Sequence, residues 1–355
     1  MIYGRSTADR LRKDLVMEQN LVFLISTPRA GSTMLMRILN ATSSIVSRPE
    51  PHLMPALAHL GFWETVEKAP FDQLQAQMAM RELVKAFPNQ DADYYEACRA
   101  YCDSLYGKMF DITKPEGNTD IRYFLDKTPA NALVLPFLTK VYPNAKYIFL
   151  TRHPGAIFAS YANSFFDGDY KAAVDFNPIL SRYIPAMATE LRNPSVPLIH
   201  VSYEQVVSNP EETLKRLTDF LEVPYEPEAL DYKRAKVAEG LGDPLGVQKH
   251  DRPVTSSKDK WVLELAADKR KFEIVAKQVA GVTPEDLQQW GTPKDTLWSA
   301  MDEADPKLYK KRKQEWTRYV LTRKLLIWLR RDIQNRPHGK LIRKIRFFCD
   351  VLLRG

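Results

Sequence analysis

The sequence predicts an α/β fold in which a parallel sheet is flanked by helices. Three observations support this prediction: there are three apolar runs of strand length, a helical pattern follows each of them, and the spacing between them fits βαβ units. Continuous apolar runs are typical of strands that are covered on both faces, as parallel strands are. Ligands of such a sheet are expected beyond the carboxyl ends of its strands.

The first strand is predicted over residues 21–26, and the helical spacing of apolar side chains begins at Ser32. The short segment between them contains a glycine, so a tight loop is expected there. Backbone N–H groups, the positive helix terminus and two hydroxyls together make a cradle for phosphate or sulfate. The residues of this P-loop-like cradle are Pro28, Arg29, Ala30, Gly31, Ser32 and Thr33. It differs from a Walker A loop, because the cation precedes the glycine.

A second strand is predicted over residues 146–151, and Pro154 suits the first turn of the helix that follows. Arg152 stands at the carboxyl end of this strand, and Ser160 lies two turns into the helix. Together they can bind a second phosphate, with the guanidinium as a two-pronged donor. Two anion sites on neighbouring strands suggest a nucleotide with phosphates at both ends. Taken alone, the simpler interpretation is an ordinary βα turn for the first segment and a capped helix start for the second.

A third strand is predicted over residues 196–201, and a helix is expected to open near Asn209. Between the first two strand-helix units, residues 55–117 have a mostly helical and aromatic pattern, which indicates an inserted helical segment near the site. We therefore expect one α/β domain over residues 1–305. The aromatic side chains of the insertion favour an apolar or sugar-binding pocket, or a helical core.

The positive charge is concentrated in a carboxyl-terminal extension. Residues 306–355 contain 16 Lys and Arg against 3 Asp and Glu, although the whole chain has a net charge of only +7. Two basic amphipathic helices are predicted there, separated near Pro337. Three interpretations stay open: helices packed on the body, a surface for an anionic membrane, or a dock for an acidic carrier protein. Nucleic acid is not expected, because no binding motif accompanies the charge.

The remaining composition restricts the class of protein. Three cysteines are too few for a disulfide framework, so a reducing, cytoplasmic location is expected, with peripheral membrane association as an addition. The amino terminus lacks the apolar stretch of a secretory signal, and an apolar run of membrane-spanning length is missing from the sequence.

Over residues 20–262 the chain resembles the PAPS-dependent sulfotransferases, where PAPS is 3′-phosphoadenosine-5′-phosphosulfate. The resemblance rests on the loop at residues 28–33, on Arg152 with Ser160, and on four further segments. These segments are Pro49 to Leu53, Asp126 to Pro129, Tyr203 to Glu211 and Lys260-Trp261. The Arg in the loop makes the chain more similar to the tyrosylprotein, carbohydrate and polyketide-associated branches than to the aryl and steroid enzymes.

The resemblance implies a set of residues that bind PAPS. The loop with Arg29 would hold the 5′-phosphosulfate, and Arg152 with Ser160 would hold the 3′-phosphate. Lys258 and Lys260 would close over the 3′-phosphate, and Tyr203 would pack near the loop. Sulfuryl transfer resembles phosphoryl transfer, so fixed cations are expected to stabilise the charge that spreads over the oxygens. The sequence shows no obvious metal site, and no metal requirement is expected.

Lys127 is the second expected cation, and the acceptor hydroxyl needs a base. Glu50 and His52 are the candidates, because they follow the first helix where the chain returns toward the loop. Glu50 also matches the catalytic glutamate of the tyrosylprotein branch, and His250 is a weaker candidate for touching the substrate.

The expected function is transfer of the sulfuryl group of PAPS to a hydroxyl acceptor, which can be a lipid, a polyketide or carrier-bound acyl chain, or a carbohydrate. Two alternatives belong to other classes. An NTPase or kinase with a degenerate loop is disfavoured by the missing Lys after the glycine. A silent PAPS-binding protein is disfavoured because pure binding needs no base.

Overall fold

A computed structural model describes residues 17–48, 50–59, 71–115, 120–234, 251–255, 258–309, 318–330, 333 and 335–352. In this part of the chain, five parallel strands form one sheet in the order β2-β3-β1-β4-β5. The strands are β1 (Leu21–Ser26), β2 (Ile45–Arg48), β3 (Tyr123–Asp126), β4 (Lys146–Thr151) and β5 (Leu198–Ser202). The strand that precedes the P-loop-like segment is therefore the central one.

Helices connect the strands and extend the chain beyond them. The helices between β1 and β5 are α2 (Ser32–Asn40), α3 (Leu53–Ala58), α4 (Phe71–Lys85), α5 (Asp91–Thr113), α6 (Leu135–Val141), α7 (Pro154–Phe165), α8 (Tyr170–Phe176) and α9 (Ile179–Arg192). Those after β5 are α10 (Tyr203–Ser208), α11 (Pro210–Leu221), α12 (Lys260–Ala267), α13 (Lys269–Ala280), α14 (Pro284–Trp290), α15 (Ser299–Asp302), α16 (Arg318–Arg330) and α17 (Pro337–Leu352). Short 3-10 turns include η1 (Met17–Asn20) and η2 (Pro129–Val134).

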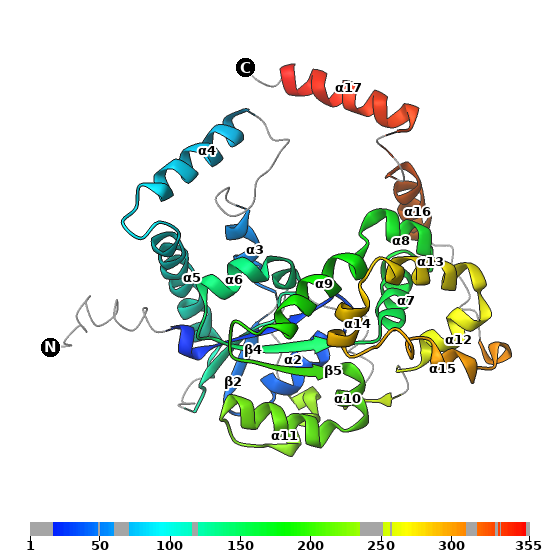
Figure 1. Cartoon of the computed structure of the whole chain (residues 1–355), viewed down its shortest axis with the longest axis horizontal. Helices are drawn as coiled ribbons and strands as arrows, with labels where there is room; N and C mark the ends of the chain where they lie inside the picture. The colour runs from blue at the N-terminus through cyan, green and yellow to red at the C-terminus, as the bar shows by residue number, and fades with distance from the viewer. Residues whose placement is uncertain are drawn as a thin grey trace.

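Both faces of the sheet are covered, as the continuous apolar strands predict. Phe23 and Ile25 of β1 belong to a core that includes side chains of α5, α6, α7 and α9. Val22 and Leu24, whose side chains alternate with these, belong to a second core with α2, α10 and α11. Figure 1 shows α9 on one side of the sheet and α11 on the other.

The sequence predictions for the sheet are confirmed for β1 and β4 and, with a shifted start, for β5, but they miss the two strands on the other side of β1. β1 and β4 have the predicted bounds and lie side by side. β5 begins at Leu198 rather than at residue 196, because Pro197 has no N–H to donate to a neighbouring strand. The strands β2 and β3 were not predicted, since each has only four residues.

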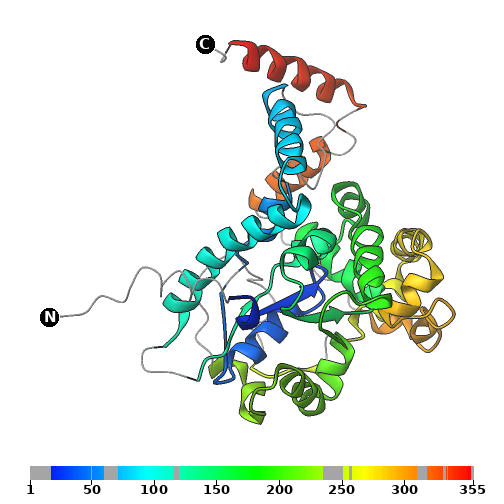
Figure 2. The ribbon, with the colours of Figure 1, turned by 60° about the vertical axis from the view of Figure 1, so that its left-hand side comes forward.

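The insertion and the extension are helical, as expected. α4 and α5 both fall within residues 55–117, and α16 and α17 are separated just before Pro337. Figures 1 and 2 show α16 and α17 outside the α/β body, at the same end of the molecule as α4. Among the described helices, none is both long and apolar enough to cross a bilayer.

Candidate functional site

The loop between β1 and α2 ends at Gly31, a position where the backbone conformation and the available space favour glycine. Arg29 and Gly31 both have left-handed conformations, with φ of 70° and 95°. A Cβ built on Gly31 would lie 2.5 Å from Cδ2 of Tyr203, so the glycine is required by the backbone and by the ring beside it. Ser32 then starts α2, and the first N–H groups of a helix lack acceptors within the helix. This loop thus presents donors beyond the end of β1.

The two predicted anion-binding motifs meet in one cluster. Arg29 Nε donates a hydrogen bond to Ser160 Oγ at 3.1 Å, although the two residues are 131 positions apart. A guanidinium nitrogen of Arg152 donates to the carbonyl oxygen of Arg29 at 3.0 Å, and Arg152 Cζ lies 4.1 Å from the ring centroid of Tyr203. Burial lowers the pKa of Arg152, and the charge of Arg29 lowers it further. A bound anion would stabilise both cations.

Three helices hold the turn that carries Arg152. Trp290 of α14 donates its indole N–H to the Arg152 carbonyl at 2.8 Å, and the His153 N–H donates to Glu204 of α10 at 3.1 Å. The His153 ring stacks on Trp261 of α12 with centroids 3.9 Å apart. The guanidinium is therefore positioned by a packed turn. Trp290 was not predicted, and Glu204 was part of a matching motif without a predicted role, since nothing local to either residue marks it as a neighbour of Arg152.

His153 itself is held as a neutral ring. Its Nδ1 accepts a hydrogen bond from the Gly155 N–H at 3.1 Å, so its Nε2 carries the proton and donates to the Leu297 carbonyl at 2.7 Å. Burial lowers its pKa to about 4. A Cβ at Gly155 would lie 2.7 Å from Trp261, so the close approach of this ring requires glycine.

A second cluster of charged side chains follows β2 and β3. Lys127 Nζ donates to Glu50 Oε1 at 2.5 Å, and the other carboxylate oxygen lies 3.2 Å from His52 Nε2. The side chain of Lys127 is 2% exposed, whereas that of His52 is 45% exposed. His52 has a left-handed backbone, with φ of 53°, directly before α3. The structure thus brings the second expected cation, Lys127, together with the two candidate bases.

Asp126, the last residue of β3, lies directly before Lys127 in the chain. It is fully buried and accepts hydrogen bonds from Tyr106 Oη at 2.6 Å and from Thr128 Oγ1 at 2.7 Å. Burial raises its pKa, while these hydrogen bonds act in the opposite direction. The sequence analysis quoted Asp126 within a motif but gave it no role. The signal in the sequence that could have indicated a role for Asp126 was a carboxylate at the end of an apolar run, because a buried carboxylate needs partners.

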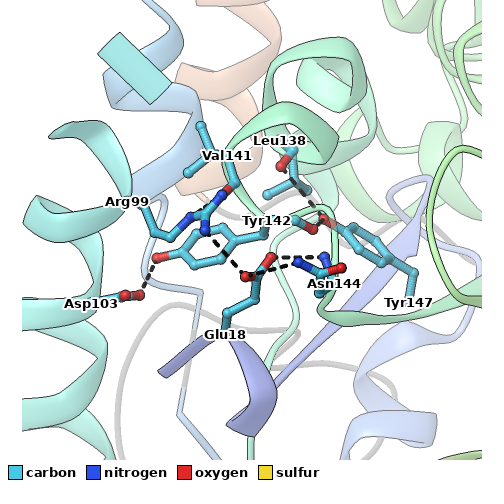
Figure 3. A network of polar contacts seen from close by, with 8 residues as sticks. All are labelled: Glu18, Arg99, Asp103, Leu138, Val141, Tyr142, Asn144 and Tyr147. Carbon is cyan, nitrogen blue, oxygen red and sulfur yellow. Dashed lines mark hydrogen bonds and ion pairs between the residues drawn. The ribbon is translucent and has the colours of Figure 1, made fainter. Parts of the chain in front are cut away.

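Tyr106 comes from α5, and a network of polar contacts anchors that helix to the sheet (Figure 3). Arg99 of α5 donates to the Val141 carbonyl at 2.6 Å and to Glu18 at 3.3 Å. One turn on, Asp103 accepts a hydrogen bond from Tyr142 at 2.7 Å. Because Tyr106 lies a further three residues along the same face, this network positions it over Asp126.

The remaining predicted residues lie around these clusters. Lys258 Nζ is 3.5 Å from Ser208 Oγ at the end of α10, and Lys260 is exposed at the first position of α12. In the loop, Ala30 and Ser32 are buried, and Thr33 is partly exposed. His250 lies outside the described residues. Within those residues, no group of three or more His, Cys, Asp or Glu side chains is arranged to hold a metal ion.

The fold and the two clusters define an α/β protein with a cationic, P-loop-like site at the carboxyl edge of its sheet. A family model described as "Sulfotransferase family" matches residues 21–227, which is more than half of the chain. The chain belongs to this family.

Individual relatives are more distant. Nodulation protein NoeE of Sinorhizobium fredii is 31% identical over 140 residues, which cover 39% of this chain and 30% of NoeE. A putative protein-tyrosine sulfotransferase of Caenorhabditis briggsae is 24% identical over 60% of this chain and 69% of its own length. The solved sulfotransferase domain of the Synechococcus PCC 7002 olefin synthase has a TM-score of 0.47 and 23% identity, over 72% of this chain and 93% of that domain.

Proposed function

We propose that this protein transfers the sulfuryl group of PAPS to a hydroxyl acceptor. The observation that supports this most is the convergence of Arg29, Arg152 and Ser160 beside the amino terminus of α2. Two guanidinium groups and a helix terminus suit a ligand with several anionic groups. The family to which the chain belongs supports sulfuryl transfer as the reaction.

In this proposal the donor is bound between the two cations. The N–H groups after Gly31 and the side chain of Arg29 contact the 5′-phosphosulfate, and Arg152 contacts the 3′-phosphate. Ser160 orients Arg29 through the hydrogen bond between Oγ and Nε. As the sulfur–oxygen bond to the leaving phosphate breaks, Arg29 stabilises the charge that grows on the leaving oxygen.

The acceptor hydroxyl lies at the second cluster and loses its proton as its oxygen bonds to sulfur. Glu50 and His52 are the two possible bases, and they contact each other at 3.2 Å. We favour Glu50 as the base that receives the proton, because one carboxylate oxygen is held by Lys127 and the other by His52. Lys127 then also places positive charge beside the oxygens of the transferred group.

We propose an acceptor that carries its hydroxyl on an apolar chain or ring. Phe165 at the end of α7 is 48% exposed, and its ring centroid lies 5.6 Å from Arg29 Cζ. Phe176 of α8 is similarly exposed. Exposed aromatic rings beside a cationic site can hold an apolar substrate next to the reacting group. A lipid, a polyketide or carrier-bound acyl chain and a carbohydrate remain the classes to be screened.

We place this activity in the cytoplasm. The proposal is supported by free thiols, because Cys98, Cys102 and Cys349 each lack a disulfide in the described part of the chain.

The first test is calorimetric binding of adenosine 3′,5′-bisphosphate against ADP, without added metal. We expect the bisphosphate to bind more tightly, and Arg152→Met to remove this preference. The exposed Lys215→Met on α11 is the matched control and should bind like the wild type. Preference for ADP, or a requirement for magnesium, would contradict the proposal and favour an NTPase.

A further inference from the structure

The apolar side chains of α16 and α17 lie on the outside of the protein. Leu321, Leu325 and Trp328 of α16 are 52–54% exposed. In α17, Leu341, Ile345 and Phe348 are 54–63% exposed. Spacings of four and three residues place each set on one face of its helix. Both helices therefore present an apolar face outward.

The rest of the α17 surface is basic. Lys340, Arg343, Lys344 and Arg346 are all exposed and lie outside the stripe formed by Leu341, Ile345 and Phe348. The whole extension, residues 306–355, carries 16 Lys and Arg against 3 Asp and Glu. A helix with one apolar face and one strongly basic face has the composition of an element that lies in a membrane interface.

The corner between the two helices is built by specific contacts. His338 donates its Nε2 proton to the Leu329 carbonyl at 2.7 Å and stacks on Trp328 with ring centroids 6.1 Å apart. Arg336 Cζ lies 5.5 Å from the Trp328 centroid. A Cβ on Gly339 would lie 1.6 Å from the Ile333 carbonyl oxygen, so the two backbone segments of the corner are in close contact there. The apolar faces are thus presented by a defined corner.

We propose that α16 and α17 bind the surface of an anionic lipid bilayer. Such a surface takes up apolar side chains and attracts Lys and Arg at the same time. A second copy of the chain would cover the apolar faces but bring two strongly basic segments together. An acidic carrier protein would pair with the basic face, and the apolar faces would stay in water. The bilayer is the one partner of these three that matches both properties.

The placement of the helices allows this contact. Figures 1 and 2 show α17 as the outermost element, away from the sheet and from the helices that cover it. Arg29, Glu50 and Arg152 lie within the α/β body and take no part in the proposed surface. Membrane binding by α16 and α17 is therefore separable from the proposed transfer of the sulfuryl group.

The test is co-sedimentation of the full chain with vesicles of phosphatidylcholine, with and without phosphatidylglycerol. We expect binding to the anionic vesicles only, with an affinity that falls as salt is added. The variant K340Q/R343Q/K344Q/R346Q should lose at least about tenfold in affinity, because each basic side chain near the surface contributes to binding. The variant L341S/I345S/F348S should lose binding even at low salt.

The matched control is K269Q/R270Q/K277Q, which removes three exposed charges from α13 and should bind vesicles like the wild type. Unchanged thermal unfolding and bisphosphate binding would show that each variant is folded. Equal loss in the α13 control would overturn the proposal, since it would show a general charge effect. Failure of the wild type to bind anionic vesicles would also overturn it, as would burial of the α17 stripe in a dimer or a carrier complex instead.

Discussion

Two clusters of charged side chains lie at the carboxyl ends of the strands, and they are held in different ways. Arg29 and Arg152 make their contacts to a hydroxyl, a carbonyl oxygen and an aromatic ring. Glu50 instead lies between two basic groups, with Lys127 at 2.5 Å and His52 at 3.2 Å. The first cluster brings two positive charges together, with Glu204 acting on the pKa of Arg152, whereas in the second a carboxylate lies directly between two basic groups.

This difference indicates two kinds of chemistry at one edge of the sheet. Two guanidinium groups held close together are stabilised by a bound anion, so the first cluster suits ligand binding. A carboxylate oriented by an ammonium and an imidazole is placed to accept a proton from a hydroxyl, so we infer that the second cluster suits proton transfer. The donor and acceptor sides of the proposed reaction are thus distinguished by their electrostatics.

The strongest test of the donor side is Arg29→Ala. We expect the conversion of PAPS to adenosine 3′,5′-bisphosphate to slow by about 10³-fold, because a donor to the leaving oxygen is lost. The rate is measured with an acceptor chosen from a screen of fatty alcohols, phenols and sugars. The exposed Lys215→Ala is the control, and equal rates in the Arg29 variant and the wild type would refute the assignment.

The acceptor side is tested by comparing Glu50→Gln with His52→Gln. If Glu50 is the base, its variant should lose about 10²- to 10⁴-fold in kcat while bisphosphate affinity is unchanged. His52→Gln should lose less, about tenfold, because Gln can still donate a hydrogen bond to the carboxylate. The reverse order of effects would assign the base to His52.

Binding alone should respond to Arg152→Met. We expect the Kd of adenosine 3′,5′-bisphosphate to rise roughly 10- to 100-fold, as for the loss of a hydrogen bond to a charged group. The Kd of AMP, which has no 3′-phosphate, should change little. A similar loss for both ligands would mean that Arg152 positions the Arg29 loop through its carbonyl contact and leaves the 3′-phosphate to other residues.

The smallest expected effect concerns His153, next to Arg152. Burial lowers its pKa from 6.5 to about 4, so between these values the unfolded chain binds a proton that the folded chain does not. The free energy of unfolding should therefore fall as the pH is lowered from 6.5 toward 4, by roughly 1–3 kcal/mol from this group. Urea unfolding of His153→Asn should show a flatter pH dependence than that of the wild type, and an unchanged slope would contradict this assignment.

The sequence predicted β1 and β4 but missed β2 and β3, for a local reason. β1 and β4 are six-residue apolar runs that lead into turns, and such a pattern is visible without any partner. β2 and β3 have only four residues each, and a polar side chain of β2 is satisfied across the sheet. Ser47 Oγ donates to the Leu125 carbonyl at 2.9 Å, a pairing that the sequence does not reveal.

The sequence by itself determined the short local motifs. The loop with Arg29 and Gly31, the strand end with Arg152 and the basic amphipathic helices all depend on residues that are close together in the chain. Their conformations follow from backbone sterics, helix termini and periodicity, which act over a few residues.

Only the tertiary structure decided which of these motifs contact each other and which other residues they contact. Ser160 holds Arg29 across 131 positions, and Lys127 holds Glu50 across 77. Tyr106 from the insertion reaches Asp126 because a network one to two turns earlier in α5, at Arg99 and Asp103, fixes that helix. These contacts depend on the strand order, with β1 between β3 and β4, and on the packing of both faces of the sheet. Neither is encoded in local periodicity, because each results from the burial of apolar surface by the whole chain.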